Sequence, residues 1–272
     1  MTKNILVIGA SSGMGKDLSL ALLKANHNVY CCARRVDKMQ YLQEQGANIY
    51  KLDVCDESNV QQVVAEVIKH AGHLDIVYSN SGFAIAGPVE ETPIDKVHAQ
   101  FDTNVYGAAR VARAVLPYMR EQNSGRIIFT TSIAARISTS MNSWYSASKH
   151  ALNGMAKGLA QEVADFNIKV ITIEPGCVKT EFDSHQLADM VATNNMETYK
   201  AIVEKSHDFL ADAYGKGSCT QSTVNTMLKA GFANKPKLSY RSTLDAKLML
   251  FAQNLIGEKL MGKAVLKLIK KF

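Results

Sequence analysis

Short apolar runs alternate with longer stretches of mixed character along the first two thirds of the chain. Residues 57–71 typify the mixed stretches, because their apolar side chains recur at the spacing of one helix face. Asp56 precedes this stretch as a helix N-cap and Gly72 follows it as a helix end, so we expect a helix here. The apolar runs are typical of buried strands and occupy residues 5–8, 29–32, 49–52, 74–78, 127–131 and 168–173.

The alternation of these two patterns predicts the fold. Strands that are apolar at nearly every position have both faces of their sheet covered. Strands that alternate with helices form parallel sheets with right-handed crossovers. We therefore expect an α/β fold, a doubly wound parallel sheet of the Rossmann type with helices on both faces, in one domain over residues 1–243.

The pattern changes after residue 173. Residues 180–217 are polar and irregular and too long for an ordinary connection, so we expect a substrate lid. Residues 218–231 regain helical spacing, and residues 237–243 could supply a last strand. Residues 244–272 form a basic amphipathic C-terminal extension, which we expect to pack on its own domain or on a second subunit. Weak contact with a membrane surface is the alternative for this extension.

Glycines cluster where the first apolar run ends. Gly9, Gly13 and Gly15 lie between the predicted strand and a helix that begins near Lys16. Glycines at this point permit a tight turn and let backbone N–H groups approach a pyrophosphate at the helix N-terminus. The phosphate loop of an NTPase would need a spacing one residue shorter and a Ser or Thr in place of Asp17. The turn therefore predicts a dinucleotide site, with a ligand-free turn as the alternative.

The end of the second apolar run favours NADP over NAD. An NAD site has an acidic residue here for the ribose hydroxyl, whereas this chain has Ala33 followed by Arg34 and Arg35. Guanidinium groups bind a 2′-phosphate that a carboxylate would repel. Ser11 and Ser12 could add hydroxyl contacts to the same phosphate. A solvated arginine pair at the start of a helix is the alternative.

A tyrosine and a lysine stand four residues apart further along the chain. Tyr145 and Lys149 share one face of a predicted helix. A tyrosine titrates near about 10, so acid–base work at neutral pH requires that its phenolate be stabilised, and a nearby ammonium does this. Such a pair alone is usually incidental, but the glycine turn upstream favours a catalytic role.

Residues 4–180 resemble the short-chain dehydrogenase/reductase family in its compact single-domain branch, through the glycine turn and the spacing of Tyr145 and Lys149. The resemblance implies a catalytic serine thirteen residues before the tyrosine, which is Ser132. It also implies that Asn104 kinks a helix and holds a water in the proton relay. Together, the turn, the arginines and the resemblance place these residues at the cofactor: Gly9, Ser11, Ser12, Gly13, Met14, Gly15, Arg34, Arg35, Asp53, Val54, Asn80, Ser81, Gly82, Tyr145, Lys149, Pro175, Gly176, Val178 and Thr180.

The chain departs from the family pattern in two places. Asn80, Ser81 and Gly82 stand where the family usually has Asn-Ala-Gly, and small side chains are retained. The usual Asp-Gly-Gly ending after the last strand is replaced by the basic extension. The resemblance still implies a homodimer or homotetramer, formed through the helices that contain Asn104 and Tyr145.

The activity implied by the resemblance is hydride transfer from NADP(H) to the carbonyl carbon of a small molecule. Tyr145 would give the proton to the oxygen, Ser132 would hydrogen-bond that oxygen, and Lys149 would lower the tyrosine pKa while holding the ribose. Oxidation of a secondary alcohol, as in hydroxysteroid dehydrogenases, and a non-catalytic NADP-binding sensor are the alternatives. The expected lid carries side chains that either suit a bulky lipophilic carbonyl or pack the lid: Phe182, Met190, Met196, Tyr199, Phe209 and Tyr214.

Charge and cysteine content limit the kinds of partner and setting that we expect for the chain. The net charge of +6 belongs to residues 235–272, which hold nine Lys or Arg against two acids, so a nucleic-acid surface on the main domain is not expected. Five cysteines without a CxxC spacing predict neither a disulfide framework nor a zinc site and favour a reducing, cytoplasmic setting. His70 and His73 lack an acidic partner, so we expect no metal. The run at residues 5–8 is too short for a signal peptide, so we expect a soluble protein.

Overall fold

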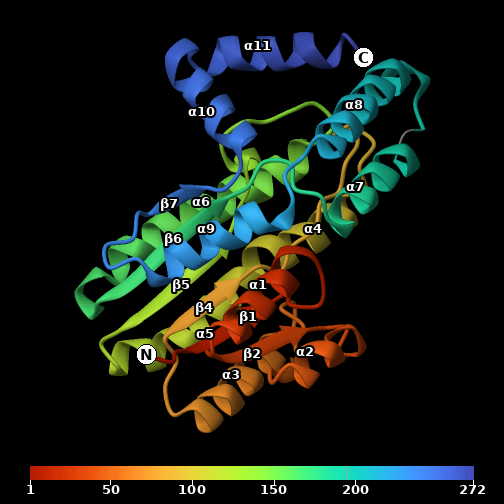
Figure 1. Cartoon of the computed structure of the whole chain (residues 1–272). Helices are drawn as coiled ribbons and strands as arrows, with labels where there is room; N and C mark the ends of the chain where they lie inside the picture. The colour runs from red at the N-terminus through yellow and green to blue at the C-terminus, as the bar shows by residue number, and fades with distance from the viewer. Residues whose placement is uncertain (194) are drawn as a thin grey trace.

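The computed structural model describes residues 1–193 and 195–272. Over these residues, seven parallel strands form one sheet in the order β3-β2-β1-β4-β5-β6-β7 (Figure 1). The predicted doubly wound parallel sheet is confirmed. The strand bounds are β1 Asn4–Ile8, β2 Asn28–Ala33, β3 Asn48–Lys51, β4 Ile76–Ser79, β5 Gly125–Thr130, β6 Ile168–Glu174 and β7 Ser239–Arg241.

Helices cover both faces of this sheet (Figure 1). Alternate residues of β1 point to opposite sides, so that Leu6 and Ile8 belong to one core and Ile5 and Val7 to the other. This two-sided burial is the reason that the strand runs are apolar at nearly every position. One face is covered by α1 (Gly13–Lys24), α2 (Gln40–Glu44) and α9 (Thr220–Phe232), and the other by α3 (Glu57–Ala71), α5 (Ala108–Glu121) and α6 (Ser143–Glu162).

The order of the strands reverses direction between β1 and β4. β1 pairs with β2 on one side and with β4 on the other, so Ile8 faces Cys32 in one register and Ser79 in the other. The crossover helices therefore diverge at this point and leave a crevice beyond the carboxyl ends of the strands. Open α/β sheets bind their ligands in such a crevice.

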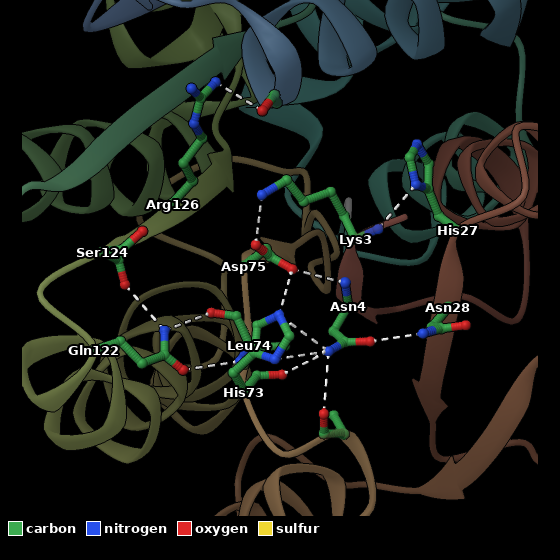
Figure 2. Close-up of polar contacts among 12 residues, drawn as sticks. Lys3, Asn4, His27, Asn28, His73, Leu74, Asp75, Gln122, Ser124 and Arg126 are labelled. Atoms are coloured by element: carbon green, nitrogen blue, oxygen red, sulfur yellow. Dashed lines mark hydrogen bonds and ion pairs between the residues drawn. The ribbon is translucent and has the colours of Figure 1, made fainter. Parts of the chain in front are cut away.

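At the other end of the strands, polar contacts link the segments around the amino ends of β1 and β4 (Figure 2). Asp75 accepts hydrogen bonds from the Asn4 backbone N–H at 2.8 Å and from Lys3 Nζ at 2.7 Å. The side chain of Gln122 binds both the N–H and the C=O of Leu74, at 2.9 and 3.0 Å. Because a side chain takes both backbone groups of Leu74, β4 begins at Ile76 and not at residue 74 as predicted. These contacts occupy the amino ends of the strands, so we look for the site at the carboxyl ends.

The helix predicted at residues 57–71 is confirmed as α3. The Asp56 side chain accepts a hydrogen bond from the Asn59 backbone N–H at 3.0 Å, and Gly72 ends the helix at a φ of 76°. Near the crevice, α4 (Ile94–Phe101) continues through a π-helical turn, Asp102–Gly107, into α5. Single 3-10 turns lie at Asp37–Met39, Ile133–Ala135 and Ala164–Phe166.

The expectation of an irregular lid at residues 180–217 is wrong. This segment forms α7 (Glu181–Ala192) and α8 (Glu197–Gly215), and the Thr180 side chain caps α7 by accepting from the Phe182 N–H. The two helices share a small core, which includes Met190 of α7, Val203 of α8 and also Ala86 and Met141 from other segments. Their apolar positions meet one another, and not the sheet, so the sequence shows weak periodicity for each helix taken alone.

The C-terminal extension is also helical. It forms α10 (Leu244–Ile256) and α11 (Glu258–Ile269), joined at Gly257 with a φ of 80°. Both lie at one end of the molecule beside α8 (Figure 1), where Leu250, Met261 and Val265 pack with Ile137. Within residues 1–193 and 195–272, no helix combines the length and apolar character that crossing a membrane requires.

Candidate active site

The glycine turn after β1 has no room for a side chain at Gly9 or Gly15. A Cβ on Gly9, whose φ is 84°, would lie 2.9 Å from the backbone nitrogen of Ser81, and a Cβ on Gly15 would overlap the carbonyl oxygen of Gly9. Asn80 closes the other side, since its backbone N–H donates to Ile8 O at 3.0 Å. The start of α1 is thereby open toward the crevice, where its N–H groups can hold a phosphate.

A cavity of about 820 Å³ occupies the crevice. Gly15 and Asn104 lie behind its lining, against Gly9 and Phe83 respectively. The structure brings all the other residues predicted for the site to its wall: Gly9, Ser11, Ser12, Gly13, Met14, Arg34, Arg35, Asp53, Val54, Asn80, Ser81, Gly82, Ser132, Tyr145, Lys149, Pro175, Gly176, Val178 and Thr180.

The two arginines lie at one end of the cavity. Arg35 donates to Ser12 Oγ at 3.5 Å, and its guanidinium is 3.8 Å from the Glu181 carboxylate at the start of α7. Arg34 and Arg35 are both exposed, and Ala33 stands at the end of β2 where an NAD site carries a carboxylate. This end of the cavity therefore presents cations and a hydroxyl beside the glycine turn.

Two unpartnered polar atoms test whether a dinucleotide fits. Asn80 Oδ1 and Thr130 Oγ1 are buried at the cavity and have no hydrogen-bond partner among the residues that the structure describes. Buried polar groups normally have a partner, so a ligand with its own donors and acceptors fits here. No group of His, Cys, Asp or Glu in the described ranges could hold a metal ion.

Ser132, Tyr145 and Lys149 meet at the centre of the cavity. Tyr145 and Lys149 occupy successive turns of α6, and Lys149 Nζ lies 5.7 Å from the centre of the Tyr145 ring. Lys149 Nζ donates to Thr130 O at 3.1 Å, at the end of β5. Ser132 follows β5, where its hydroxyl accepts from the Ala134 N–H at 3.1 Å. The end of β5 thus delivers the hydroxyl, and α6 delivers the phenol and the ammonium, to one place.

Burial sets the pKa values of the pair. It raises the pKa of Tyr145 to about 12, against the opposing effect of the Ser132 hydroxyl. It lowers the pKa of Lys149 to about 8. The sequence predicts that Lys149 lowers the pKa of Tyr145, whereas in the folded chain the loss of solvent raises this pKa.

Asn104 lies in the π-helical turn and is fully buried. Its Oδ1 accepts from the Phe83 N–H at 3.0 Å, and its Nδ2 donates to Phe83 O at 2.8 Å and to Ser148 Oγ at 3.1 Å. The predicted break in the helix is present. The side chain holds the segment after β4 against α6, so that Gly82 stays within reach of Lys149.

The lid residues divide between two roles. Phe182, Phe209 and Tyr214 line the cavity, and the ring of Phe182 lies 5.6 Å from that of Tyr145. Met190 is buried in the core of the lid, and Tyr199 donates to Glu90. Three members of the set therefore line the cavity, while Met190 and Tyr199 make contacts within the protein.

Sequence reasoning missed the contribution of the C-terminal helices. The first turn of α10 holds the segment after β6, because Thr243 Oγ1 accepts from the Gly176 N–H at 2.9 Å and Asp245 accepts from the Cys177 N–H at 2.8 Å. The one signal in the sequence was a Thr followed two residues later by an acidic residue, and this pattern predicts the N-terminus of a helix but not a site. Three further residues of α10 line the cavity, namely Leu244, Leu248 and Met249.

Comparisons with known proteins agree with this geometry. A family model described as short chain dehydrogenase matches residues 3–190. A 3-ketodihydrosphingosine reductase of Bacteroides thetaiotaomicron is 34% identical over 195 residues, 70% of each chain. Retinol dehydrogenase 8 of Homo sapiens is 28% identical over 257 residues, 89% of this chain and 82% of its own.

Solved structures show the same fold. A short-chain dehydrogenase from Streptomyces avermitilis matches with a TM-score of 0.83 and 30% identity, over 93% of both chains. Other structures of this fold hold NADP, and one holds NAD. The chain is therefore an oxidoreductase by fold and sequence, and it belongs to the short-chain dehydrogenase/reductase family.

Proposed function

We propose that the chain reduces a bulky, lipophilic ketone or aldehyde to an alcohol with NADPH as the reductant. One observation carries the proposal: Ser132, Tyr145 and Lys149 meet on the wall of a cavity that joins the glycine turn to an apolar chamber. The chamber has the size and the apolar character of a small-molecule site with a few polar groups. Its apolar wall includes Ile137, Phe182, Phe209, Leu210, Leu248 and Met249.

The three side chains divide the proton chemistry. Bound NADPH would supply the hydride to the carbonyl carbon. Tyr145 stays protonated at neutral pH, since its pKa is about 12, and gives its proton to the oxygen as negative charge develops there. Ser132 donates a hydrogen bond to the same oxygen. Lys149 is a cation below pH of about 8 and stabilises the phenolate that remains.

The raised pKa of Tyr145 keeps the phenol protonated, which is the form that the reductive direction requires. A reductase begins its cycle with a protonated acid, whereas an alcohol dehydrogenase begins with a base. Burial keeps the phenol in the acid form, so the reductive direction starts from the state that predominates in the folded chain.

The arginine pair supports NADPH as the cofactor. Arg34, Arg35 and Ser12 would bind the 2′-phosphate, and the end of β2 has no carboxylate to repel it. Replacing both arginines, Arg34→Ser/Arg35→Ser, is expected to raise the NADPH dissociation constant on the order of 100-fold and to leave the NADH constant within a few-fold. Tighter binding of NADH than of NADPH by the unmodified chain would contradict the assignment.

The lipophilic substrate class has two supports. Part of the cavity wall is built from large apolar side chains, including Phe182 and Phe209. The names of two relatives refer to 3-ketodihydrosphingosine and to retinol, and both molecules are lipophilic.

The test is a screen of NADPH oxidation across short-chain and long-chain ketones, aldehydes, steroids and quinones. We expect turnover with bulky lipophilic carbonyls, its loss in Tyr145→Phe, and its retention in Tyr106→Phe, which changes an exposed tyrosine. NADPH binding should stay near normal in both variants. Retained turnover in Tyr145→Phe would remove the proposed role of Tyr145, and a cofactor-binding chain that reduces no carbonyl would favour a sensor.

A further inference from the structure

The α10 helix is apolar on two opposite sides. Its inner side, with Ala246 and Leu250, is buried against the body. Leu244, Leu248, Phe251 and Leu255 recur at intervals of four, three and four residues on the opposite side, and they are between 59% and 69% exposed. We call these four residues the outer stripe. A helix with apolar residues all round is normally buried, so the outer stripe marks a surface that another phase or molecule covers.

The α11 helix carries positive charge in the same region. Met261, Val265 and Ile269 face the body, and Lys259, Lys263, Lys267 and Lys270 lie on the other side of the helix and are exposed. We call these four lysines the lysine face. None of them forms an ion pair with any residue in the described part of the chain. Their charge is therefore free to act on an outside partner.

Both helices are held in place on the body. Gln253 donates to Arg136 O at 3.3 Å, and the ring of Phe272 lies 5.8 Å from that of Phe209 at an angle of 79°. Lys205 Nζ donates to Lys270 O at 3.2 Å. Figure 1 shows α10 and α11 together at the end of the molecule that α8 also occupies. The outer stripe and the lysine face thus belong to a docked unit and not to a free tail.

The outer stripe continues into the cavity. Leu244 and Leu248 belong to the stripe and also line the cavity, where Met249 and Phe209 are their neighbours in the lining. A molecule seated on the stripe therefore lies at the mouth of the substrate chamber.

We propose that α10 and α11 dock on an anionic lipid surface, from which a lipophilic carbonyl substrate enters the cavity. The outer stripe buries its side chains at the acyl boundary, and the lysine face contacts anionic headgroups. A lipid surface matches both features, because its acyl boundary can bury the outer stripe and its anionic headgroups can pair with the lysine face. The entry of substrate rests on the proposed function, but the docking does not.

The docking is tested with the full chain and vesicles. We would sediment the protein with vesicles of phosphatidylcholine containing phosphatidylglycerol and with vesicles of phosphatidylcholine alone. Binding is expected with the anionic vesicles and should weaken at high salt. Lys263→Gln/Lys267→Gln should weaken it about 30-fold and Phe251→Ser/Leu255→Ser on the order of 100-fold.

Matched controls change the same residue types elsewhere on the surface. Val89→Ser/Ile94→Ser removes two exposed apolar side chains, and Lys69→Gln/Lys169→Gln removes two exposed lysines. Both should leave vesicle binding within two-fold. Failure of the unmodified chain to sediment, or equal losses in the control variants, would overturn the docking. A concentration-dependent dimer that Phe251→Ser/Leu255→Ser dissociates, without vesicle binding, would instead assign the stripe to a second copy.

The entry of substrate has its own readout. The same variants should lower the rate with a long-chain ketone carried in anionic vesicles and leave the rate with a short water-soluble ketone unchanged. If the variants and the unmodified chain reduce the vesicle-borne ketone at equal rates, entry of substrate from the lipid surface is overturned. If the unmodified chain binds vesicles but reduces neither ketone, the proposed function fails and the docking stands.

Discussion

The carboxylate of Asp245 accepts a hydrogen bond from the backbone N–H of Cys177 at 2.8 Å and lies directly over Gly176. Asp245 is in the first turn of α10, and Cys177 lies in the cavity wall after β6. A Cβ on Gly176 would overlap this carboxylate. The C-terminal helices are therefore tied to the segment that the resemblance places beside the nicotinamide.

Asp245 is expected to act as a positioning residue. Asp245→Ala leaves the N–H of the half-buried Cys177 without its partner, which costs about 1–3 kcal/mol, so NADPH binding should weaken about ten-fold or more as the segment loosens. Asp245→Asn keeps an acceptor oxygen and should retain most of the binding. Fluorescence titration of NADPH, together with separate kcat and KM values, measures the effect. An equal loss in both variants would show that the charge matters and not the hydrogen bond.

Asn104→Ala is expected to lower both stability and cofactor binding. The substitution removes the side chain that pairs with both backbone groups of Phe83, so the free energy of unfolding should fall by about 2 kcal/mol. Asn104→Asp keeps the acceptor for the Phe83 N–H but loses the donors to Phe83 O and Ser148 Oγ and places an acid in a fully buried position, so its loss in denaturant unfolding should be at least as large. Unchanged NADPH affinity in Asn104→Ala would show that the segment after β4 is held by other contacts.

Two glycines provide a matched pair of substitutions. Gly15→Ala places a Cβ against the carbonyl oxygen of Gly9, so the turn must open and NADPH binding should be lost. Gly154→Ala, in the middle of α6, meets no atom of the described residues within 4 Å and should raise stability by about 0.5–1 kcal/mol. Calorimetry of both variants, with and without NADPH, separates the effects. Normal affinity in Gly15→Ala would contradict the tight turn.

Lys149 predicts how stability depends on pH. Its pKa is about 8 in the folded chain and 10.5 as the ordinary value, so between these limits the unfolded chain binds more protons. The free energy of unfolding should then rise with pH through this window, by about 3 kcal/mol in total, while below pH 8 the cost of burying the charge is present in full. Urea unfolding at pH 7 to 9 should show the first part of this rise in the unmodified chain, before the buried cysteine thiols begin to titrate in the unfolded chain.

Lys149→Met should abolish the rise, because it removes the titrating group. Lys157→Met changes a half-buried lysine on the same helix and should retain it. The comparison ends at pH 9, since burial raises the pKa of the Cys31 thiol to about 11 and that of the Cys177 thiol to about 12, which makes stability fall at higher pH. Parallel curves for the unmodified chain and Lys149→Met would mean that the lysine is not buried as a cation.

Periodicity predicted most of the sheet and its helices. The two cores of β1, with Leu6 on one side and Val7 on the other, follow from a strand that is apolar at each position, and the caps of α3 could be seen in Asp56 and Gly72. The irregular lid was wrong because Met190 and Val203 pack on one another across two helices, a pairing that the spacing within either helix does not reveal.

The sequence by itself determined what depends on neighbours along the chain: the tight turn at Gly9, the absence of an acid after β2, and one helix face shared by Tyr145 and Lys149. Only the tertiary structure decided the rest. Asp245 reaches Cys177 across 68 residues of chain, and the Tyr145 pKa rises because Ala84, Ala134 and Phe182 close around the phenol from separate elements. Burial and long-range contacts depend on how the elements pack, and a local pattern carries no record of that packing.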